Sequence, residues 1–293
     1  MGEIVGAGLV SHVPTIMLPE ATRRQINDGK ESSLVTGLRR LRVEVLDRLA
    51  ADTVVVLDTH WEVTFEHVVT AHERRRGVFT SHELPRGMRQ IAYDIPGDQP
   101  LARAVAELAD GRDDTWVLAC DDPYLPIFYG TVNLWSYLGG AGERWVSCGI
   151  NQTAEPGDFL LLGELIAGAV AGLDRRVVLL ASGGLSHRFL PFRQLRGRES
   201  ADLGNLHTPE AAAADQHLLG LLERGDHGAV LDWLPSYRRF APEGHFGHYL
   251  IMLGALGVAA CRARGVRFSD YEASVGTGQA HVWFERPEGG WAA

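Results

Sequence analysis

Short, continuous apolar runs alternate along the chain with stretches in which apolar residues recur every three or four positions. The continuous runs are too short for helices and predict buried strands. The periodic stretches predict amphipathic helices that cover a sheet. The predicted strands span residues 4–10, 53–57, 115–119, 144–150 and 176–181; the predicted helices span 34–49, about 101–108, 158–173, a segment that opens at 208–210, and about 245–264.

This alternation predicts one α/β domain over residues 1–293, with a central mainly parallel or mixed β-sheet flanked by helices. The chain has no linker, low-complexity segment or internal repeat that would divide it. The tail, residues 266–284, holds two further β-rich runs around Gly276-Thr277-Gly278, which we interpret as a hairpin turn because no Lys follows to make a phosphate loop. Ligands of such sheets bind beyond the carboxyl ends of the strands, so we expect the active site there.

Three of the predicted strands lead into a histidine: His12, His60 and His187. Polar side chains that gather at one edge of a sheet cost free energy unless they bind something. Imidazole suits a borderline metal such as iron or zinc, and neutral imidazole also transfers protons. The three histidines therefore predict a metal or proton-transfer site, with the role of each residue left open.

Charge and cysteine content limit the partners and the cellular compartment that we expect for this protein. The chain has 28 Lys and Arg against 37 Asp and Glu, a net charge of −9, and its basic residues are scattered, so we expect no nucleic acid partner. The three cysteines lie far apart without a Cys-x-x-Cys pair, which argues against disulfides and a cysteine zinc site and favours a reducing cytoplasm. No basic leader precedes the first apolar run and no apolar stretch reaches membrane-spanning length, so we expect a soluble, cytoplasmic protein with no membrane partner.

The sequence matches other known catalytic and cofactor-binding motifs poorly. After Gly6-Ala7-Gly8, Ser11 replaces the closing glycine of a dinucleotide fingerprint. Gly184-Leu185-Ser186-His187-Arg188 lacks the closing glycine of a nucleophile elbow, and the sequence contains no His-Glu-x-x-His motif. His245 and His248 have the spacing of metal ligands on one helix face, but an exposed polar face explains that spacing equally well.

Six motifs in register resemble those of the class III extradiol ring-cleavage dioxygenases, of the protocatechuate 4,5-dioxygenase type. The resemblance extends from residue 4 to about residue 284 and is strongest to the homoprotocatechuate 2,3-dioxygenase branch. The motifs are Ser11-His12-Val13-Pro14, Asp58-Thr59-His60-Trp61, Thr80-Ser81-His82-Glu83-Leu84-Pro85, Ala181-Ser182-Gly183-Gly184-Leu185-Ser186-His187-Arg188-Phe189, Pro242-Glu243-Gly244 and Gly276-Thr277-Gly278-Gln279.

The resemblance implies an Fe(II) centre held by His12, His60 and Glu243, with His187 as the acid/base residue. Two imidazoles and one carboxylate leave three coordination positions open, enough for both oxygens of a catechol and for O2. With Fe(II) this donor set carries a net positive charge, which attracts a catecholate.

Some positions depart from the family pattern. Tyr129 stands where many class III enzymes have a second active-site histidine, although the resembling branch also has Tyr there; a phenol donates a hydrogen bond but is a poor base at neutral pH. His245 and His248 follow Glu243 where the branch has an Asn-Met-His-Asp-like run, and Val275 stands where serine is common. We assign Tyr129 a catalytic role and assign Val13, Arg188, His245 and His248 to substrate binding, the last three as candidate partners of a substrate carboxylate.

The resulting hypothesis is a cytoplasmic Fe(II)-dependent extradiol dioxygenase that opens a substituted catechol with O2 to a muconic semialdehyde. Its partners would be a small aromatic substrate, O2 and further copies of the chain in a homo-oligomer. Two alternatives stay open: an o-aminophenol-type ring-cleavage dioxygenase, and a non-catalytic metal-binding relative that acts as an interaction scaffold. The presence of His187 beside three metal ligands argues against the scaffold.

Overall fold

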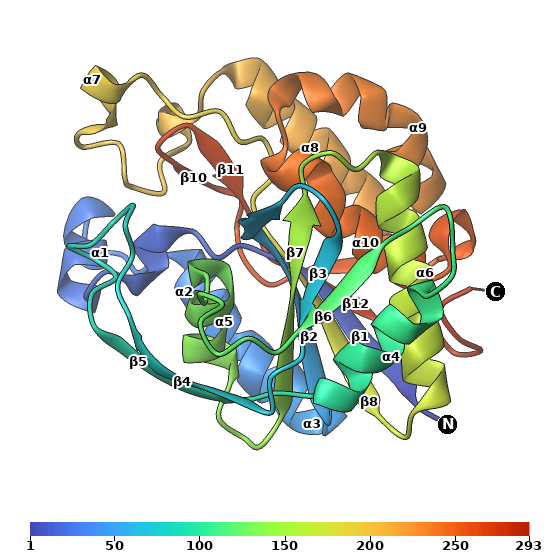
Figure 1. Cartoon of the computed structure of the whole chain (residues 1–293). Coiled ribbons are helices and arrows are strands. Elements are labelled where there is room, and N and C mark those ends of the chain that lie inside the picture. Colours follow the sequence, from blue (N-terminus) through green and yellow to red (C-terminus); the bar gives the residue numbers. More distant parts are fainter. Residues whose placement is uncertain (293) are drawn as a thin grey trace.

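A mixed sheet of eight strands forms the centre of the computed structural model, which describes residues 1–292 (Figure 1). Its strand order is β6, β3, β7, β2, β8, β1, β12, β9. The inner strands β7, β2, β8 and β1 are parallel, whereas β12 is antiparallel to β1 and β3 is antiparallel to β7. The central mixed sheet that the sequence predicts is confirmed. Its strands are β1 (Glu3–Val10), β2 (Thr53–Val63), β3 (His67–Thr70), β6 (Val117–Cys120), β7 (Arg144–Asn151), β8 (Arg176–Ser182), β9 (Gly265–Arg267) and β12 (Val282–Glu285).

Helices cover both faces of this sheet because its inner strands are apolar on both sides. In β2, Val54 and Val56 pack into one apolar cluster, and Val55 and Leu57 pack into the other. The polar side chains of a site are therefore confined to the strand ends. The Val54 side is covered by α2 (Ser33–Arg40), the π-helical η2 (Leu41–Leu46) and α5 (Tyr129–Leu138). The opposite side is covered by α4 (Gln99–Ala109), α6 (Pro156–Gly172), α8 (Pro209–Arg224), α9 (His227–Tyr237) and α10 (Gly247–Ala255).

The predicted helix over about 245–264 is shorter in the structure. It begins only at Gly247, because Gly244, His245 and Phe246 all have left-handed backbone angles. It ends at Ala255, and Gly257 with φ of +97° turns the chain away. The other short helices are α1 (Glu20–Ile26), α3 (Asp47–Leu49), α7 (Phe192–Leu195), η1 (Pro14–Met17), η3 (Leu203–Asn205), η4 (Arg238–Phe240), η5 (Glu243–Phe246) and η6 (Val258–Ala260).

Two hairpins lie outside the central sheet. β10 (Glu272–Ser274) and β11 (Thr277–Gln279) form the predicted hairpin of the tail, but its turn is Val275-Gly276 rather than Gly276-Thr277-Gly278. Both turn residues have positive φ, +47° and +115°, as a tight two-residue turn requires. The second hairpin, β4 (Arg74–Phe79) with β5 (Ile91–Pro96), has no counterpart among the predicted elements. Across residues 1–292, the helices include none with the length and apolar character needed to cross a membrane.

Candidate metal centre and substrate pocket

His12 lies just beyond the carboxyl end of β1. Its ring is 2 % exposed, and its Nδ1 is hydrogen-bonded to Ser182 Oγ at the end of β8, 2.7 Å away. The Asn133 side chain donates a hydrogen bond to the His12 carbonyl at 2.7 Å. With Nδ1 occupied and the backbone held, His12 Nε2 faces Glu243 Oε1 at 3.3 Å.

His60 lies on a bulge within β2 rather than after the strand. The prediction that this strand stops at residue 57 is wrong: pairing with β7 continues from Asp58–Gly149 to Glu62–Ile150, and the residues between leave the ladder. The buried Asp58 carboxylate accepts the His60 N–H at 3.0 Å and also the Thr131 N–H at 2.7 Å. One carboxylate therefore ties the bulge to the first turn of α5.

Glu243 comes from a strained turn ahead of α10. The three residues after it have φ of +54°, +57° and +64°, and the last of them, Phe246, is fully buried and stacked on Tyr249. The Glu243 Oε1 atom accepts a hydrogen bond from Thr59 Oγ1 at 2.6 Å, and Oε2 accepts one from the Gly184 N–H. Packing of Phe246 therefore fixes the turn, and two donors aim the carboxylate.

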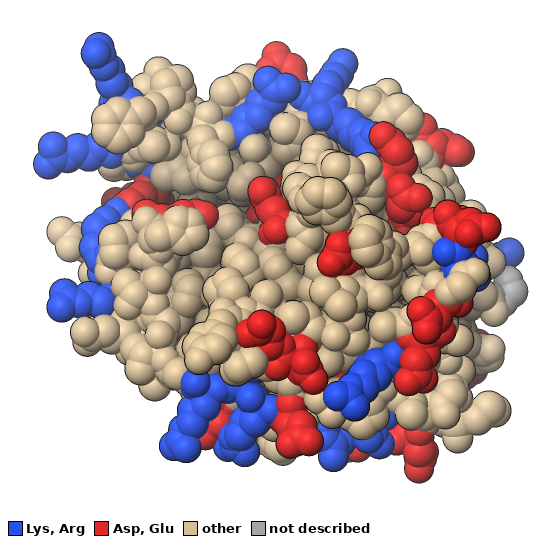
Figure 2. All heavy atoms as spheres, in the orientation of Figure 1, with Lys and Arg blue, Asp and Glu red and all other residues tan. Residues whose placement is uncertain are grey.

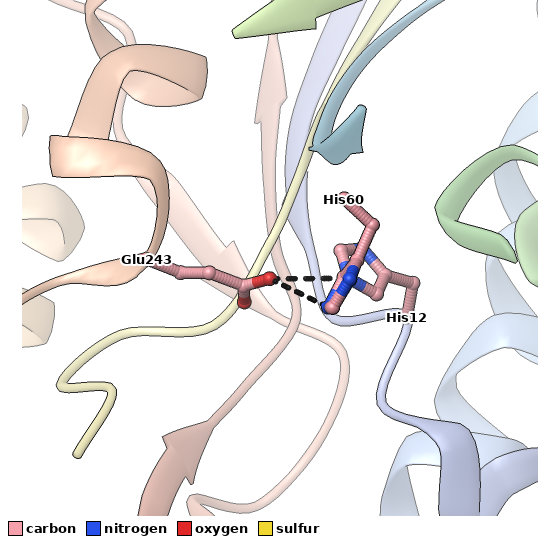
Figure 3. A group of neighbouring side chains, drawn as sticks. All are labelled: His12, His60 and Glu243. Carbon is pink, nitrogen blue, oxygen red and sulfur yellow. Dashed lines mark ion pairs between the residues drawn. The ribbon is translucent and has the colours of Figure 1, made fainter. Parts of the chain in front are cut away.

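His12, His60 and Glu243 converge on one point. One donor atom from each lies within 4.8 Å of the other two, and Figure 3 shows the carboxylate pointing at both imidazole rings. Burial disfavours a charged His60, but Glu243 and Glu83 outweigh this effect and raise the pKa of His60 to about 10. Burial also opposes the charge of Glu243, yet the neighbouring His187 and His12 hold its pKa well below the usual range.

This environment favours positive charge among the three donors. Two imidazoles and one carboxylate, oriented by Ser182, Thr59 and Gly184, fit a divalent transition metal with open positions. The three residues that the resemblance assigns to the metal are therefore brought together as a possible metal site.

His187 lies beside this donor set. Its Nε2 is 3.5 Å from Glu243 Oε2, and its side chain is 17 % exposed. Burial is the main cause that lowers the pKa of His187. The ring is therefore neutral at pH 7 and able to accept a proton.

Tyr129 and Glu83 both contact His60 of the donor set. The Tyr129 hydroxyl contacts His60 Nε2 and donates a hydrogen bond to Glu83 Oε2 at 3.2 Å, while Glu83 Oε1 lies 3.3 Å from His60 Nδ1. Burial raises the pKa of Tyr129 above its usual value, so the phenol stays protonated and acts as a donor. Sequence reasoning gave Glu83 no role, although the residue lies in the Thr80–Pro85 motif; no strand or helix pattern there indicates where its side chain points.

A cavity of about 390 Å³ opens from the donor set towards the surface. This volume suits a substituted single ring. Val13, assigned to the substrate from the sequence, lines it. Its other walls are largely apolar, formed by Pro14, Leu84, Phe189, Leu195 and Val275.

The other three residues assigned to the substrate lie outside this cavity. Arg188 is exposed and donates to the Arg239 carbonyl at 2.8 Å. His245 is exposed, 3.1 Å from Gln152 Oε1, whereas His248 is fully buried in α10, where burial lowers its pKa to about 3. Because α10 begins only at Gly247, the two histidines do not share a helix face, and the alternative metal pair is not formed.

The α/β sheet with this donor set at its edge agrees with a known enzyme class. Residues 6–276 match the family described as the catalytic LigB subunit of aromatic ring-opening dioxygenase, and the chain belongs to this family. It is therefore a class III extradiol ring-cleaving dioxygenase, and the non-catalytic scaffold is set aside.

Two relatives from Escherichia coli are informative. The 3,4-dihydroxyphenylacetate 2,3-dioxygenase is 29% identical over 262 residues, which cover 88% of this chain and 91% of the relative. The crystal structure of an uncharacterized protein from strain K12 aligns with a TM-score of 0.65 and 16% identity, over 95% of this chain and 99% of the other. The second match shows the fold alone.

Proposed function

We propose that this dioxygenase uses Fe(II), held by His12, His60 and Glu243, to open the ring of a catechol that carries a side chain para to one hydroxyl. The product would be a muconic semialdehyde. The convergence of the three donor atoms within 4.8 Å supports the proposal. The relative named as acting on 3,4-dihydroxyphenylacetate, a catechol of this type, supports the substrate class.

Fe(II) held by His12, His60 and Glu243 would supply a Lewis-acidic site for the catechol and a route by which electrons pass from the ring to O2. The chain's own residues handle protons and position. Neutral His187 takes the proton of a substrate hydroxyl at Nε2 and returns it when the ring opens. When substrate binds, the Tyr129 phenol would turn its single O–H from Glu83 to a substrate oxygen, and the apolar walls keep water from the reacting ring.

The test is anaerobic purification, reconstitution with Fe(II) or Mn(II), and a screen of catechols and 2-aminophenol for coloured ring-opened products. We expect Fe(II)-dependent turnover of para-substituted catechols. His12→Ala and Glu243→Ala should lose bound metal together with activity, because two remaining protein ligands form a weaker chelate. Stoichiometric iron and normal turnover in both variants would refute the ligand assignment, and selective turnover of 2-aminophenol would establish the aminophenol-type reaction instead.

Three further expectations from the sequence remain predictions: one catalytic domain over residues 1–293, a homo-oligomer and a cytoplasmic location. Light scattering measures the oligomeric state, and cell fractionation measures the location.

A further inference from the structure

Four charged side chains from two loop segments line the cavity. Glu83 and Arg86 come from the segment before β5, and Arg196 and Glu199 come from the segment after α7. On the face shown in Figure 2, Lys and Arg side chains project near a hollow beside the α7 segment, with Asp and Glu side chains within it. Whatever substituent a bound ring carries would meet these charges.

Three of the four charges already have partners. Arg86 and Glu199 form an ion pair that joins the two segments. Glu83 contacts His60 Nδ1 at 3.3 Å and accepts a hydrogen bond from the Tyr129 hydroxyl at 3.2 Å. Arg86 and Glu199 thereby neutralise each other, and the Glu83 carboxylate is hydrogen-bonded within the protein.

Arg196 is the exception. Among residues 1–292, no carboxylate lies within 4.0 Å of its guanidinium, although the residue lines the cavity and is exposed. Its neighbour Leu195 lines the same cavity as part of the apolar wall. Leu195 thus forms part of the apolar wall of the cavity. Arg196, the next residue, places an unpaired positive charge beside that wall.

We propose, on the basis of the proposed function, that the ring substituent of the substrate is anionic and that Arg196 binds its carboxylate. With the two ring oxygens at the metal end, the substituent extends along the apolar walls towards the outer charges. A guanidinium offers a carboxylate two parallel N–H donors. A neutral ring substituent does not form this bidentate ion pair. A cationic substituent would meet an unpaired cation, because Glu199 is paired with Arg86 and Glu83 is engaged by His60 and Tyr129.

The experiment compares catechols whose ring substituents are anionic, neutral or cationic. Wild-type enzyme reconstituted with Fe(II) is assayed with 3,4-dihydroxyphenylacetate, its methyl ester, 4-methylcatechol and dopamine. We expect kcat/KM for the acid to exceed that for the ester by roughly 10-fold or more, with the lowest value for dopamine. Added salt should raise KM for the acid and leave KM for the ester unchanged, because only the acid forms an ion pair.

Variants assign the effect to one residue. Arg196→Gln should lower kcat/KM for the acid by roughly 10-fold through KM, leaving kcat and the ester unchanged. Arg196→Glu should reverse the preference between the acid and dopamine. Arg193→Gln is the matched control, an exposed arginine of α7 outside the cavity, and Arg188→Gln tests the residue first assigned from the sequence. Neither control should change the preference.

The outcomes separate this proposal from the proposed function. If catechols are opened but acid and ester react equally, or if Arg196→Gln slows both equally, ring opening stands and the role of Arg196 is refuted. If no catechol is opened, the proposed function fails, and an anaerobic binding titration of the metal-loaded protein with 3,4-dihydroxyphenylacetate decides about Arg196. A Kd that is equal in wild type and Arg196→Gln would then overturn the proposal.

Discussion

At the scale of single residues, His187 is positioned through its neighbour in the chain. Ser186 donates its N–H and its hydroxyl to the buried Asp215 carboxylate, at 3.0 and 2.7 Å. The hydroxyls of Tyr237 and Tyr271 donate to the same carboxylate at 2.7 and 2.6 Å. Because this network satisfies the carboxylate, it fixes the backbone before His187 without using the ring nitrogens.

His187→Phe separates proton transfer from metal binding. The variant keeps His12, His60, Glu243 and a ring of similar size, so we expect it to retain iron and substrate binding. Loss of a positioned acid/base group should lower kcat by about 10²-fold or more. Iron analysis and steady-state kinetics measure the two effects. His82→Phe, at an exposed position, is the control, and loss of iron in His187→Phe would make His187 a ligand instead.

At the scale of elements, α6 and α10 are in backbone contact. A Cβ on Gly163 of α6 would lie 2.0 Å from the Ile251 carbonyl oxygen, and one on Gly254 of α10 would lie 2.1 Å from the Leu160 carbonyl oxygen. The close crossing holds α10, and through it the strained turn that carries Glu243.

Gly163→Ala should therefore force the two helices apart. We expect a loss of about 1–3 kcal/mol in the free energy of unfolding, as for other overpacked sites. Urea denaturation measures this change. The control is Gly172→Ala at the end of the same helix, where a Cβ meets nothing within 4 Å; it should be neutral or stabilise by up to about 1 kcal/mol. Equal stability of the two variants would show that α6 and α10 tolerate a wider spacing.

The elements also show what the sequence could and could not predict. Apolar runs located the inner strands, and therefore His12, because burial on both faces leaves a clear pattern. The roles of Glu243 and Tyr129 were predicted only from the resemblance. Glu243 lies in a strained turn and Tyr129 at the start of a helix, and no hydrophobic periodicity marks either position. Arg188 and His248 were assigned to the substrate because they adjoin functional residues. Their side chains point elsewhere, and side-chain direction depends on backbone angles that local pattern does not encode.

At the scale of the whole molecule, a buried histidine couples folding to pH. His281 is fully buried; its Nδ1 accepts the Ser11 N–H at 3.1 Å, and its Nε2 is hydrogen-bonded to the Leu34 carbonyl at 3.0 Å. Burial lowers the pKa of His281 to about 4, below its ordinary value of 6.5. The unfolded chain therefore takes up this proton first as pH falls. The contribution of His281 to stability is complete above pH 6.5 and declines until about pH 4.

We expect the decline attributable to His281 to reach about 3 kcal/mol in metal-free protein. The measurement is urea unfolding at several values between pH 7.5 and pH 4.5, comparing wild type with His281→Gln. The variant should be less stable at neutral pH and should lose less stability on acidification. His82→Gln, at an exposed position, should follow the wild type. Parallel pH curves for wild type and His281→Gln would contradict this account.

The position of β1 has a consequence for biosynthesis. This strand is translated before the other strands of the sheet, yet it lies between β8 and β12, and the Ser11–His281 hydrogen bond joins residues 270 positions apart. A nascent chain therefore carries His12 and His60 long before Glu243 is translated and before β12 can pair. On the proposed function, a metal ion that arrived during this interval would meet an incomplete set of donors, so the site can be filled completely only after Glu243 has been translated and β12 has paired.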